Sequence, residues 1–440
     1  MYMSAHGSAG ASPSQQRESQ FRVNSRTNHL PLTETIIPSG QEAVAEAVRQ
    51  AWQAGTPVYP IGGGTHPAWG AGPGTPGLGL SLAGLARVVD YPARDLTITV
   101  EAGVTLAALA ERLAAEGQRL PVDVAFPSRA TVGGAVAVNA AGPRQFRWAS
   151  MRDYVIGIRA VDGTGTPFGG GGRVVKNAAG YDLCRLLCGS FGTLGVIVQV
   201  TLMVRPMPET SAFVACELSD LDAAEDLLAR LIQTRTLPAA VELLAGPAWQ
   251  GDPALGPLGQ PGAVRLAVGL EGSLVEVEWM IAQLKQEWRQ AGIPSPLTLV
   301  GRRADPLWDR LAHFAFAEPT GNGHGALVVR IHVLPDAVVP TLRHLRELDP
   351  NTSVQAHAGN GVIVARLSAE VSQAAALVDE RLRPKVQSAG GHVVITGRPQ
   401  GAELSRDTIF GPSPPGWTVM QSIKNRFDPK GILNRDRFLL

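Results

Sequence analysis

The spacing of apolar residues changes character near residue 210 and predicts two kinds of architecture. Before that point, short apolar segments with helical or alternating spacing are separated by long glycine-rich loops. The predicted helices are 39–54, 105–116 and 181–188, and the predicted strands are 58–61, 78–82, 87–91, 96–101, 154–162 and 194–206. The glycine run 169–172 predicts a loop.

After residue 210 the element order β-α-β-β-α-β occurs twice. The first unit has strands 212–218, 239–245, 263–270 and 297–300 with helices 220–235 and 274–291. A linking helix near 308–316 precedes the second unit, which has strands 326–334, 353–357, 361–367 and 391–396 with helices 336–347 and 369–389. This order predicts an α+β fold in which helices cover one face of a mostly antiparallel sheet.

The 440 residues are too many for one ordinary core, so we expect several domains. Residues 1–35 are polar and predict a disordered arm. Residues 36–208 then form a first domain, and 209–400 form a second domain from the two β-α-β-β-α-β units. Residues 401–440 form a tail that returns to the first domain.

Composition and charge exclude several classes of partner. The net charge of +1 gives no electrostatic reason to expect nucleic acid or an anionic membrane as a ligand. The longest apolar run, 194–204, is interrupted by Gln199 and is too short to span a bilayer, so we expect no integral membrane segment. The N-terminus lacks the apolar core of a signal peptide. A cytoplasmic location is therefore expected, with peripheral membrane association through partners as an alternative.

Cysteine content argues against a metal site. Cys184, Cys188 and Cys216 match neither iron–sulfur nor structural zinc spacing, so no metal is expected.

Three segments of small residues predict a place where backbone approaches a large ligand. They are PIGGGTH at 60–66, PSRATVGGAVAVNAAGP at 127–143 and GSFGTLGVIVQV at 189–200. A glycine turn can bind an anion through its N–H groups, and the small first turn of a helix at Thr131 suits a phosphate. Alone, the first could be an ordinary turn and the second close helix–strand packing. Together they favour a dinucleotide, although the Rossmann spacing is not matched.

The same segments, with VVKNAAGYDLCRLLCGSFGTLGVI and the closing FDPKGILN, resemble the vanillyl-alcohol-oxidase-type (PCMH-type) FAD-binding family. That resemblance implies a first domain of two subdomains that binds FAD, and a cap domain that covers the flavin ring. Within the family, 141–157 and 171–183 are most similar to the FAD-binding subunit of glycolate oxidase (glycolate dehydrogenase) complexes.

The resemblance also implies which residues contact FAD. The pyrophosphate site would be held by Gly62, Gly63, Gly64, Thr65 and His66, which follow Ile61. The flavin ribityl chain and ring would be lined by Pro127, Ser128, Thr131, Gly133, Gly134, Asn139 and Gly142. Val196 and Ile197 would contact the cofactor through their backbone, and Asn434 would reach the flavin edge.

Departures from the family pattern affect both attachment and catalysis. Thr65 stands where some members attach FAD through a histidine, so non-covalent FAD is expected. Catalytic 2-hydroxy-acid dehydrogenases of the family have GSEG where this chain has Phe191 in GSFG. Their His-x6-His pair begins at His357 here but ends in Val364, and their later Glu-His-Gly corresponds to a segment with His392 but no glutamate.

The sequence therefore leaves three functions open. The first is an FAD-binding subunit that oxidises a small 2-hydroxy acid, glycolate or D-lactate, beside a homologous catalytic flavoprotein subunit and an iron–sulfur subunit. The second is a non-catalytic FAD-binding or scaffold subunit, which Phe191, Val364 and the missing glutamate favour. The third is a stand-alone dehydrogenase for another hydroxy acid. Its site would be Arg330 and His332, although a polar, solvated strand face explains their alternation more simply. His357 is a further catalytic candidate.

Overall fold

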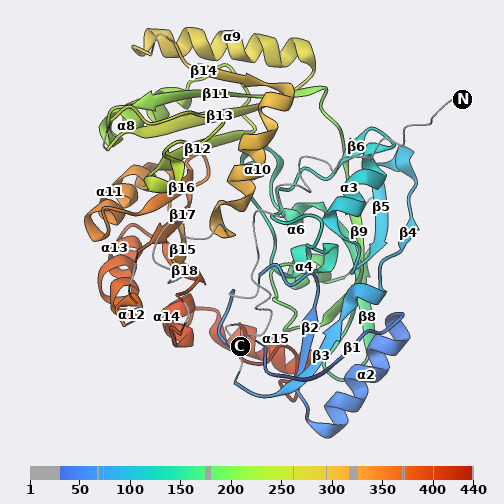
Figure 1. Ribbon diagram of the computed structural model, residues 1–440. Helices are drawn as coiled ribbons and strands as arrows, with labels where there is room; N and C mark the ends of the chain where they lie inside the picture. Colours follow the sequence, from blue (N-terminus) through green and yellow to red (C-terminus); the bar gives the residue numbers. More distant parts are fainter. Residues whose placement is uncertain are drawn as a thin grey trace, which may run out of the picture.

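The structure is a computed structural model that describes residues 30–66, 69–72, 74–173, 180–260, 262–293, 295–316, 326–368, 370, 372–399 and 401–438. Two groups of elements face each other across the molecule (Figure 1). The first group ends at residue 206, and the second, called the cap below, runs from residue 210 to residue 397. The proposed boundaries at residues 208 and 400 fall beside these limits, and the domain division stays a proposal.

The first group contains two sheets, which matches a two-subdomain arrangement. A parallel three-stranded sheet has the order β1-β3-β2, and an antiparallel five-stranded sheet has the order β4-β5-β9-β7-β8. The strands are β1 (Leu32–Ile36), β2 (Val58–Ile61), β3 (Gly77–Ser81), β4 (Val88–Asp90), β5 (Thr97–Glu101), β7 (Val155–Val161), β8 (Pro167–Gly171) and β9 (Val196–Met203). A separate short pair joins β6 (Gln118–Arg119) to β10 (Arg205–Pro206).

The helices of this group are α2 (Gln41–Ala54), α3 (Leu106–Ala114), α4 (Val132–Ala137), α5 (Gln145–Trp148), α6 (Met151–Tyr154) and α7 (Leu183–Leu187). Thr105 and Thr131 cap α3 and α4 through their hydroxyl groups, as polar N-cap residues do. One buried cluster joins α2, α3 and α4 to the five-stranded sheet and includes Ile432 and Leu433 of the tail.

Two sequence predictions fail in this group. Residues 1–29 lie outside the described residues, but Leu32–Ile36, at the end of the predicted arm, forms β1. The β-branched residues of β1 pair in parallel with β3. The strand was not predicted because most of its side chains are exposed, so its sequence lacks the apolar pattern of a buried strand. Residues 169–171 belong to β8, an edge strand whose glycines let β7 approach closely.

The cap contains one eight-stranded antiparallel sheet in the order β14-β11-β13-β12-β16-β17-β15-β18. Both predicted β-α-β-β-α-β units are present, and they join where β12 pairs with β16. The strands are β11 (Thr210–Leu218), β12 (Ala240–Ala245), β13 (Val264–Gly272), β14 (Leu297–Val300), β15 (Leu327–His332), β16 (Ser353–His357), β17 (Val362–Leu367) and β18 (His392–Gly397). The predicted α+β fold is confirmed.

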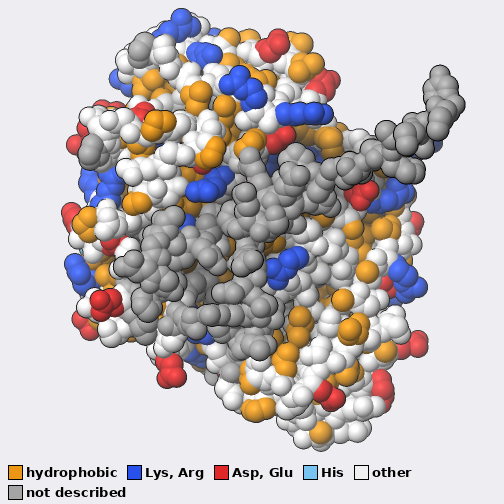
Figure 2. Space-filling view, in the orientation of Figure 1, with side chains coloured by type: hydrophobic (Ala, Val, Ile, Leu, Met, Phe, Trp, Pro, Cys, Tyr) orange, Lys and Arg blue, Asp and Glu red, His pale blue; other side chains and the backbone are white. Residues whose placement is uncertain are grey.

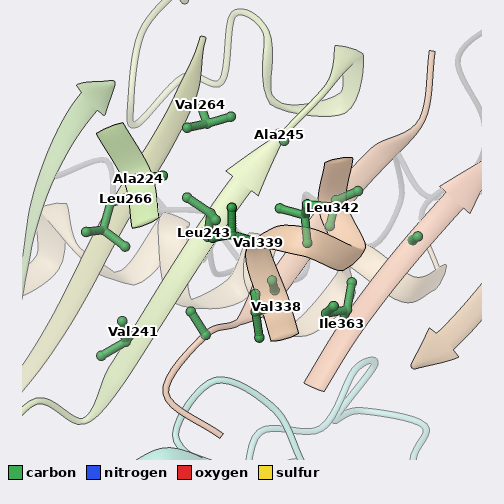
Figure 3. Close-up of a cluster of buried hydrophobic side chains, with 14 of the residues drawn as sticks. Ala224, Val241, Leu243, Ala245, Val264, Leu266, Val338, Val339, Leu342 and Ile363 are labelled. Carbon is green, nitrogen blue, oxygen red and sulfur yellow. The ribbon is translucent and has the colours of Figure 1, made fainter. Parts of the chain in front are cut away.

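Helices cover the face of the cap sheet that points away from the first group (Figure 1). They are α8 (Leu221–Leu231), α9 (Leu274–Gln290), α11 (Val338–Leu348), α12 (Ala374–Ala376) and α13 (Arg383–Ser388), with a π-helical segment Leu377–Leu382 between the last two. Alternate residues of the strands pack against these helices. Figure 3 shows Leu243 of β12 beside Val339 of α11, and Leu266 of β13 beside Ala224 of α8.

The opposite face of the cap sheet, called the inner face below, points toward the first group. Helix α10 (Asp305–His313) and the 3-10 turn Phe314–Phe316 lie on this side (Figure 1). Trp308 of α10 packs against Phe213 of β11, with 4.3 Å between the ring centroids. Because residues alternate along each strand, the inner face carries a different set of side chains from the helix-covered face.

The tail contains α14 (Arg406–Phe410) and α15 (Trp417–Phe427) and then contacts the first group. Leu433 forms a parallel bridge with Val58 of β2. The buried Asp428 carboxylate accepts hydrogen bonds from the Lys424 ammonium and from the N–H groups of Ile432 and Leu433. This network fixes the turn that the sequence DPKG predicts.

Acidic and basic side chains are interspersed on the face shown in Figure 2, as the near-zero net charge suggests. In the ranges given above, no helix is long and apolar enough to cross a membrane.

Candidate functional site

The loop of residues 62–66 presents a row of unused backbone donors. It follows β2, and within the described ranges none of its five N–H groups donates a hydrogen bond. All five residues are half-buried. Consecutive free N–H groups in a glycine turn form a concave site for an anion, so the geometry suits the pyrophosphate that the sequence assigned to this loop.

The glycines of this loop are required by a second loop that touches it. A Cβ atom at Gly63 would lie 1.8 Å from the carbonyl oxygen of Arg129, and one at Gly62 would lie 2.5 Å from Oγ1 of Thr131. Neither position accepts a side chain, because real Cβ contacts are never this short. The first two predicted glycine segments are thus packed directly on each other.

Residues from all three predicted segments line one cavity beside α4. Gly62, Gly133, Gly134 and Ile197 line one cavity, together with Pro60, Leu82, Ala137, Phe191, Gly192 and Gly195. A Cβ at Gly134 would meet only Oγ1 of Thr131, at 3.1 Å, so the space in front of this glycine is open. The three small-residue segments therefore converge, as a single shared ligand requires.

The other predicted cofactor residues lie partly at the edge of the cavity and partly in the core. Ile61 ends β2, and Pro127 and Ser128 lie in the turn before α4. The Asn434 side chain donates to the carbonyl of Phe191, at the edge of the cavity. Val196 is fully buried in the core beside Ile197.

Two further positions have local structural roles. The side chain of Asn139, a residue with positive φ, accepts a hydrogen bond from the N–H of Arg152. Gly142 packs on Asp123, because a Cβ there would lie 2.6 Å from the Asp123 side chain. Close packing is thus sufficient to explain Gly142.

His66 lies in an aromatic cluster next to the glycine loop. Its ring contacts Trp69 and Phe316 edge-on, with centroids 4.7 and 4.9 Å away, and its Nδ1 lies 3.0 Å from Oγ1 of Thr65. Burial lowers the pKa of His66 to about 4, so the ring is neutral at pH 7. Phe191, at positive φ, stacks on Phe438 at 4.8 Å.

Polar side chains form a row across the inner face of the cap. The register pairs His392 of β18 with His332 of β15, His332 with Val362 of β17, Val362 with His357 of β16, and His357 with Glu242 of β12. The structure therefore brings together all three predicted catalytic candidates, because Arg330 precedes His332 by two residues on β15. This side of the sheet is no ordinary solvated strand face.

Arg330 and His332 form a hydrogen-bonded pair on the inner face. Nε of Arg330 donates to Nε2 of His332 at 3.3 Å, and no carboxylate within the described part of the chain pairs with Arg330. Burial lowers the pKa of Arg330 to about 10. Burial also lowers the pKa of His332 to about 3, and the charge of Arg330 adds to this effect. His332 is therefore neutral at pH 7, and its ring stacks on His392 at 4.7 Å.

His357 is held by a carboxylate that sequence reasoning missed. Nδ1 of His357 lies 2.8 Å from Oε1 of the fully buried Glu242, and Nε2 of Gln355 donates to Oε2 of Glu242 at 3.0 Å. The signal was a charged residue within the apolar run of β12. Val364 lies between Arg330 and Gln355 in the register, where a second histidine would complete the His-x6-His pair. Over the ranges described, no group of three or more His, Cys, Asp or Glu side chains could hold a metal ion.

Ion pairs join the cap to the first group. Glu271 of β13 is 1% exposed and accepts from Nη1 and Nη2 of Arg119 at 2.9 and 2.6 Å. It also accepts from Nε of Arg144 at 2.7 Å and from Nε1 of Trp148 at 2.9 Å. Although burial opposes ionisation, Arg119 and Arg144 lower the pKa of Glu271 to about 2. This cluster joins β13 of the cap to residues 119–148 of the first group.

The geometry agrees with comparisons to known proteins. Residues 33–168 match the model of an "FAD binding domain", and residues 411–437 match "FAD linked oxidases, C-terminal domain". Glycolate oxidase subunit GlcD of Bacillus subtilis is 26% identical over 423 residues, which cover 91% of this chain and 87% of that protein. Glycolate oxidase subunit GlcE of Escherichia coli is 37% identical over 187 residues, 42% of this chain and 53% of that protein.

Two further similarities concern a dehydrogenase and a solved structure. D-2-hydroxyglutarate dehydrogenase of Xanthomonas citri is 35% identical over 193 residues, which cover 44% of this chain and 41% of that protein. The solved structure of an alkyldihydroxyacetonephosphate synthase superposes with a TM-score of 0.64 at 16% identity, over 91% of this chain and 76% of that one. At this identity the superposition shows the fold alone.

The open N–H groups of residues 62–66 and the cavity in front of Gly134 fit FAD, whose binding-domain model spans both segments. FAD is therefore the cofactor of this protein. The matches to the two domain models of FAD-linked oxidases and the similarity to glycolate oxidase subunits agree with the resemblance to the vanillyl-alcohol-oxidase-type (PCMH-type) family, and the protein is an FAD-dependent oxidoreductase.

Proposed function

We propose that this protein oxidises a small 2-hydroxy acid, glycolate or D-lactate, as the FAD-binding subunit of a glycolate-oxidising complex. The observation that carries the proposal is the inner-face pair of Arg330, which has no carboxylate partner among the described residues, and neutral His332. Similarity to glycolate oxidase subunits supports the substrate class. FAD supplies the acceptor for the two electrons of a CH–OH oxidation.

Arg330 binds the substrate carboxylate in this proposal. Its planar guanidinium can donate two parallel hydrogen bonds to a carboxylate, which fixes the orientation of the 2-hydroxyl group. A bound carboxylate also competes with His332 for Nε of Arg330 and so releases the Nε2 lone pair of the imidazole. The site thus couples substrate binding to the formation of a free base.

His332 accepts the hydroxyl proton in the same step. Its pKa of about 3 partly reflects the neighbouring positive charge of Arg330. A carboxylate bound at Arg330 screens this charge and moves the pKa of His332 upward, toward the range of an effective general base. His357 is held by Glu242 and serves as a positioning residue at the end of the same row.

A non-catalytic role has specific support as the second candidate. Phe191 occupies the cavity wall where catalytic relatives carry a glutamate, and Val364 replaces the second histidine beside Arg330. In that case the protein binds FAD and supports a homologous catalytic flavoprotein subunit. In either role an iron–sulfur subunit carries the electrons onward. The complex lies in the cytoplasm, with peripheral membrane contact through its partners. FAD is bound non-covalently beside Thr65 and His66.

The deciding experiment is an absorption spectrum of the purified protein before and after anaerobic addition of glycolate or D-lactate. Bleaching of the flavin band that is lost in Arg330→Gln and His332→Asn supports the catalytic role. The control is Arg343→Gln, which removes an exposed ion pair on the helix-covered side of the cap and should bleach normally. A flavin that resists both acids refutes catalysis by this chain and favours the supporting role. Acid precipitation tests attachment, because non-covalent FAD stays in the supernatant.

A further inference from the structure

The end of helix α10 contacts both loops that are predicted to bind FAD. The helix lies between the cap sheet and the first group (Figure 1), and its last residue, His313, contacts Phe126, which precedes the PSRATVGG segment. In the turn that follows, Phe316 contacts Phe126 at 5.7 Å between ring centroids and His66 of the glycine loop at 4.9 Å. A short segment of the cap therefore touches both loops.

The contact of His313 with Phe126 is a directed hydrogen bond as well as apolar packing. The backbone N–H of Phe126 donates to Nε2 of His313 at 3.0 Å, and the two rings meet edge-on at 4.9 Å. Nδ1 of His313 lies 2.8 Å from the backbone carbonyl oxygen of Asp309, and a carbonyl oxygen can only accept. Together the two contacts require a neutral ring with its proton on Nδ1. His313 is 8% exposed, so little water competes for these bonds.

Phe126 has a backbone conformation that depends on its surroundings. Its φ of 52° lies in the left-handed region, which a bulky residue seldom adopts. Such strain persists only where the surrounding structure holds it. The carbonyl of Phe126 accepts hydrogen bonds from the N–H groups three and four residues later, at 2.9 and 2.7 Å. Residues 126–130 thus form a closed turn that contains the predicted cofactor residues Pro127 and Ser128, and His313 binds its first N–H group.

The turn 126–130 also shapes the glycine loop. The carbonyl oxygen of Arg129 lies 1.8 Å from where a Cβ of Gly63 would be, and Nη2 of Arg129 donates to the carbonyl of Gly63 at 3.3 Å. A shift of the turn would therefore change the position of Gly63 and of the N–H groups beside it. One chain of contacts leads from His313 through Phe126 and Arg129 to the predicted pyrophosphate site.

We propose that His313 is a positioning residue of the FAD site, through which the cap sets how tightly the cofactor is bound. It acts through the backbone of Phe126: it holds the turn 126–130 in the shape that presents its cofactor residues and keeps Gly63 in place. Phe316 supports the same two loops by its ring contacts. The inference requires FAD binding but not the oxidation of a 2-hydroxy acid, so a flavin that neither glycolate nor D-lactate reduces leaves it intact.

Two amide side chains of different length test this role in the full-length protein. His313→Asn keeps a polar group near the position of Nδ1, beside the carbonyl of Asp309, but is too short to accept from Phe126. We expect its dissociation constant for FAD, from fluorescence titration of the apoprotein, to rise about 10-fold, as one lost buried hydrogen bond implies. His313→Gln can place its amide oxygen near the position of Nε2 and should bind FAD within about threefold of the wild type.

Leu307→Ala separates positioning from a general loosening of the cap. Leu307 is fully buried on the same helix and packs in the cap core. This variant should unfold at lower urea concentration, yet its dissociation constant for FAD should stay within about twofold of the wild type. Equal weakening of FAD binding in Leu307→Ala and His313→Asn would overturn the inference, as would wild-type affinity in His313→Asn. If His313→Asn does not fold, His313→Leu replaces it, with the same expected rise.

Hydrogen exchange of the FAD-free protein adds a measurement that needs no cofactor. Peptides that contain residues 126–130 should exchange faster in His313→Asn than in the wild type, because the N–H of Phe126 loses its acceptor and the turn opens. His313→Gln should restore slow exchange. Unchanged exchange in His313→Asn would show that the turn keeps its shape without His313 and would overturn the inference.

Discussion

Replacing Glu271 by glutamine should loosen the cap from the first group of elements. The carboxylate accepts four hydrogen bonds from Arg119, Arg144 and Trp148, and it is 1% exposed. Glutamine has nearly the same shape but no charge, and its amide group turns a donor toward one of the arginines. Arg144 still has Asp123 in the variant, while Arg119 has no other carboxylate among the described residues.

The magnitude follows from the lowered pKa. A fall from the ordinary value of 4.5 to about 2 corresponds to about 3 kcal/mol of stability at pH 7. The cost of breaking a buried pair, about 3–5 kcal/mol, agrees with this value. Because the folded-state pKa is depressed, the contribution is complete above pH 4.5 and is lost as the pH falls toward 2. At pH 4 it should already be smaller by about 1 kcal/mol.

Urea unfolding of the wild type and Glu271→Gln at pH 7 and pH 4 measures the stability that the carboxylate contributes and the part of it that is lost at low pH. The difference in the free energy of unfolding should be about 3 kcal/mol at pH 7 and should narrow at pH 4. Glu225→Gln is the matched control, because its ion pair with Arg343 is 47% and 40% exposed and should contribute less than about 1 kcal/mol. A Glu271→Gln effect no larger than that of the control, or one that is independent of pH, would refute the reasoning.

Three further substitutions test the cofactor site, the tail and the cap core. Gly63→Ala should lower FAD affinity in fluorescence titration more than tenfold, because its Cβ would lie 1.8 Å from the carbonyl of Arg129; unchanged affinity would contradict the loop geometry. Asp428→Asn should destabilise the protein by about 3–5 kcal/mol in urea, because Lys424 loses its buried partner. Leu243→Ala, at a fully buried position, should cost about 2–5 kcal/mol in the same assay, and a cost below 1 kcal/mol would place it outside the core.

Most elements could be predicted because the spacing of their apolar residues matches the helices and strands of the structure. Both units of the cap show alternating or helical spacing over at least four residues, and all eight strands lie where that spacing placed them. The errors occur where local composition opposes the fold. The glycines of β8 lack strand propensity, and the helix predicted over residues 39–54 begins only at Gln41, with Gly40 at its N-cap and no side-chain cap bond.

The site was less predictable than the fold because sequence shows neither register nor burial. The pair of His357 and Glu242 joins residues 115 positions apart on neighbouring strands. The row from His392 to Glu242 depends on the pairing of five strands, and a shift of one residue in any strand would turn its side chain away.

Two of the departures from the catalytic pattern of the family, Val364 and Phe191, affect different requirements of the reaction. Val364 removes an imidazole between Arg330 and Gln355 but leaves every positive charge of the inner face in place. Phe191 adds apolar surface to the cavity wall and stacks on Phe438. Binding an acid depends on the charges, whereas oxidising it depends on a base and on the cofactor. Affinity for carboxylates should therefore persist in this chain whether or not it turns over, and measuring binding and flavin bleaching separately distinguishes a complete enzyme from a supporting subunit.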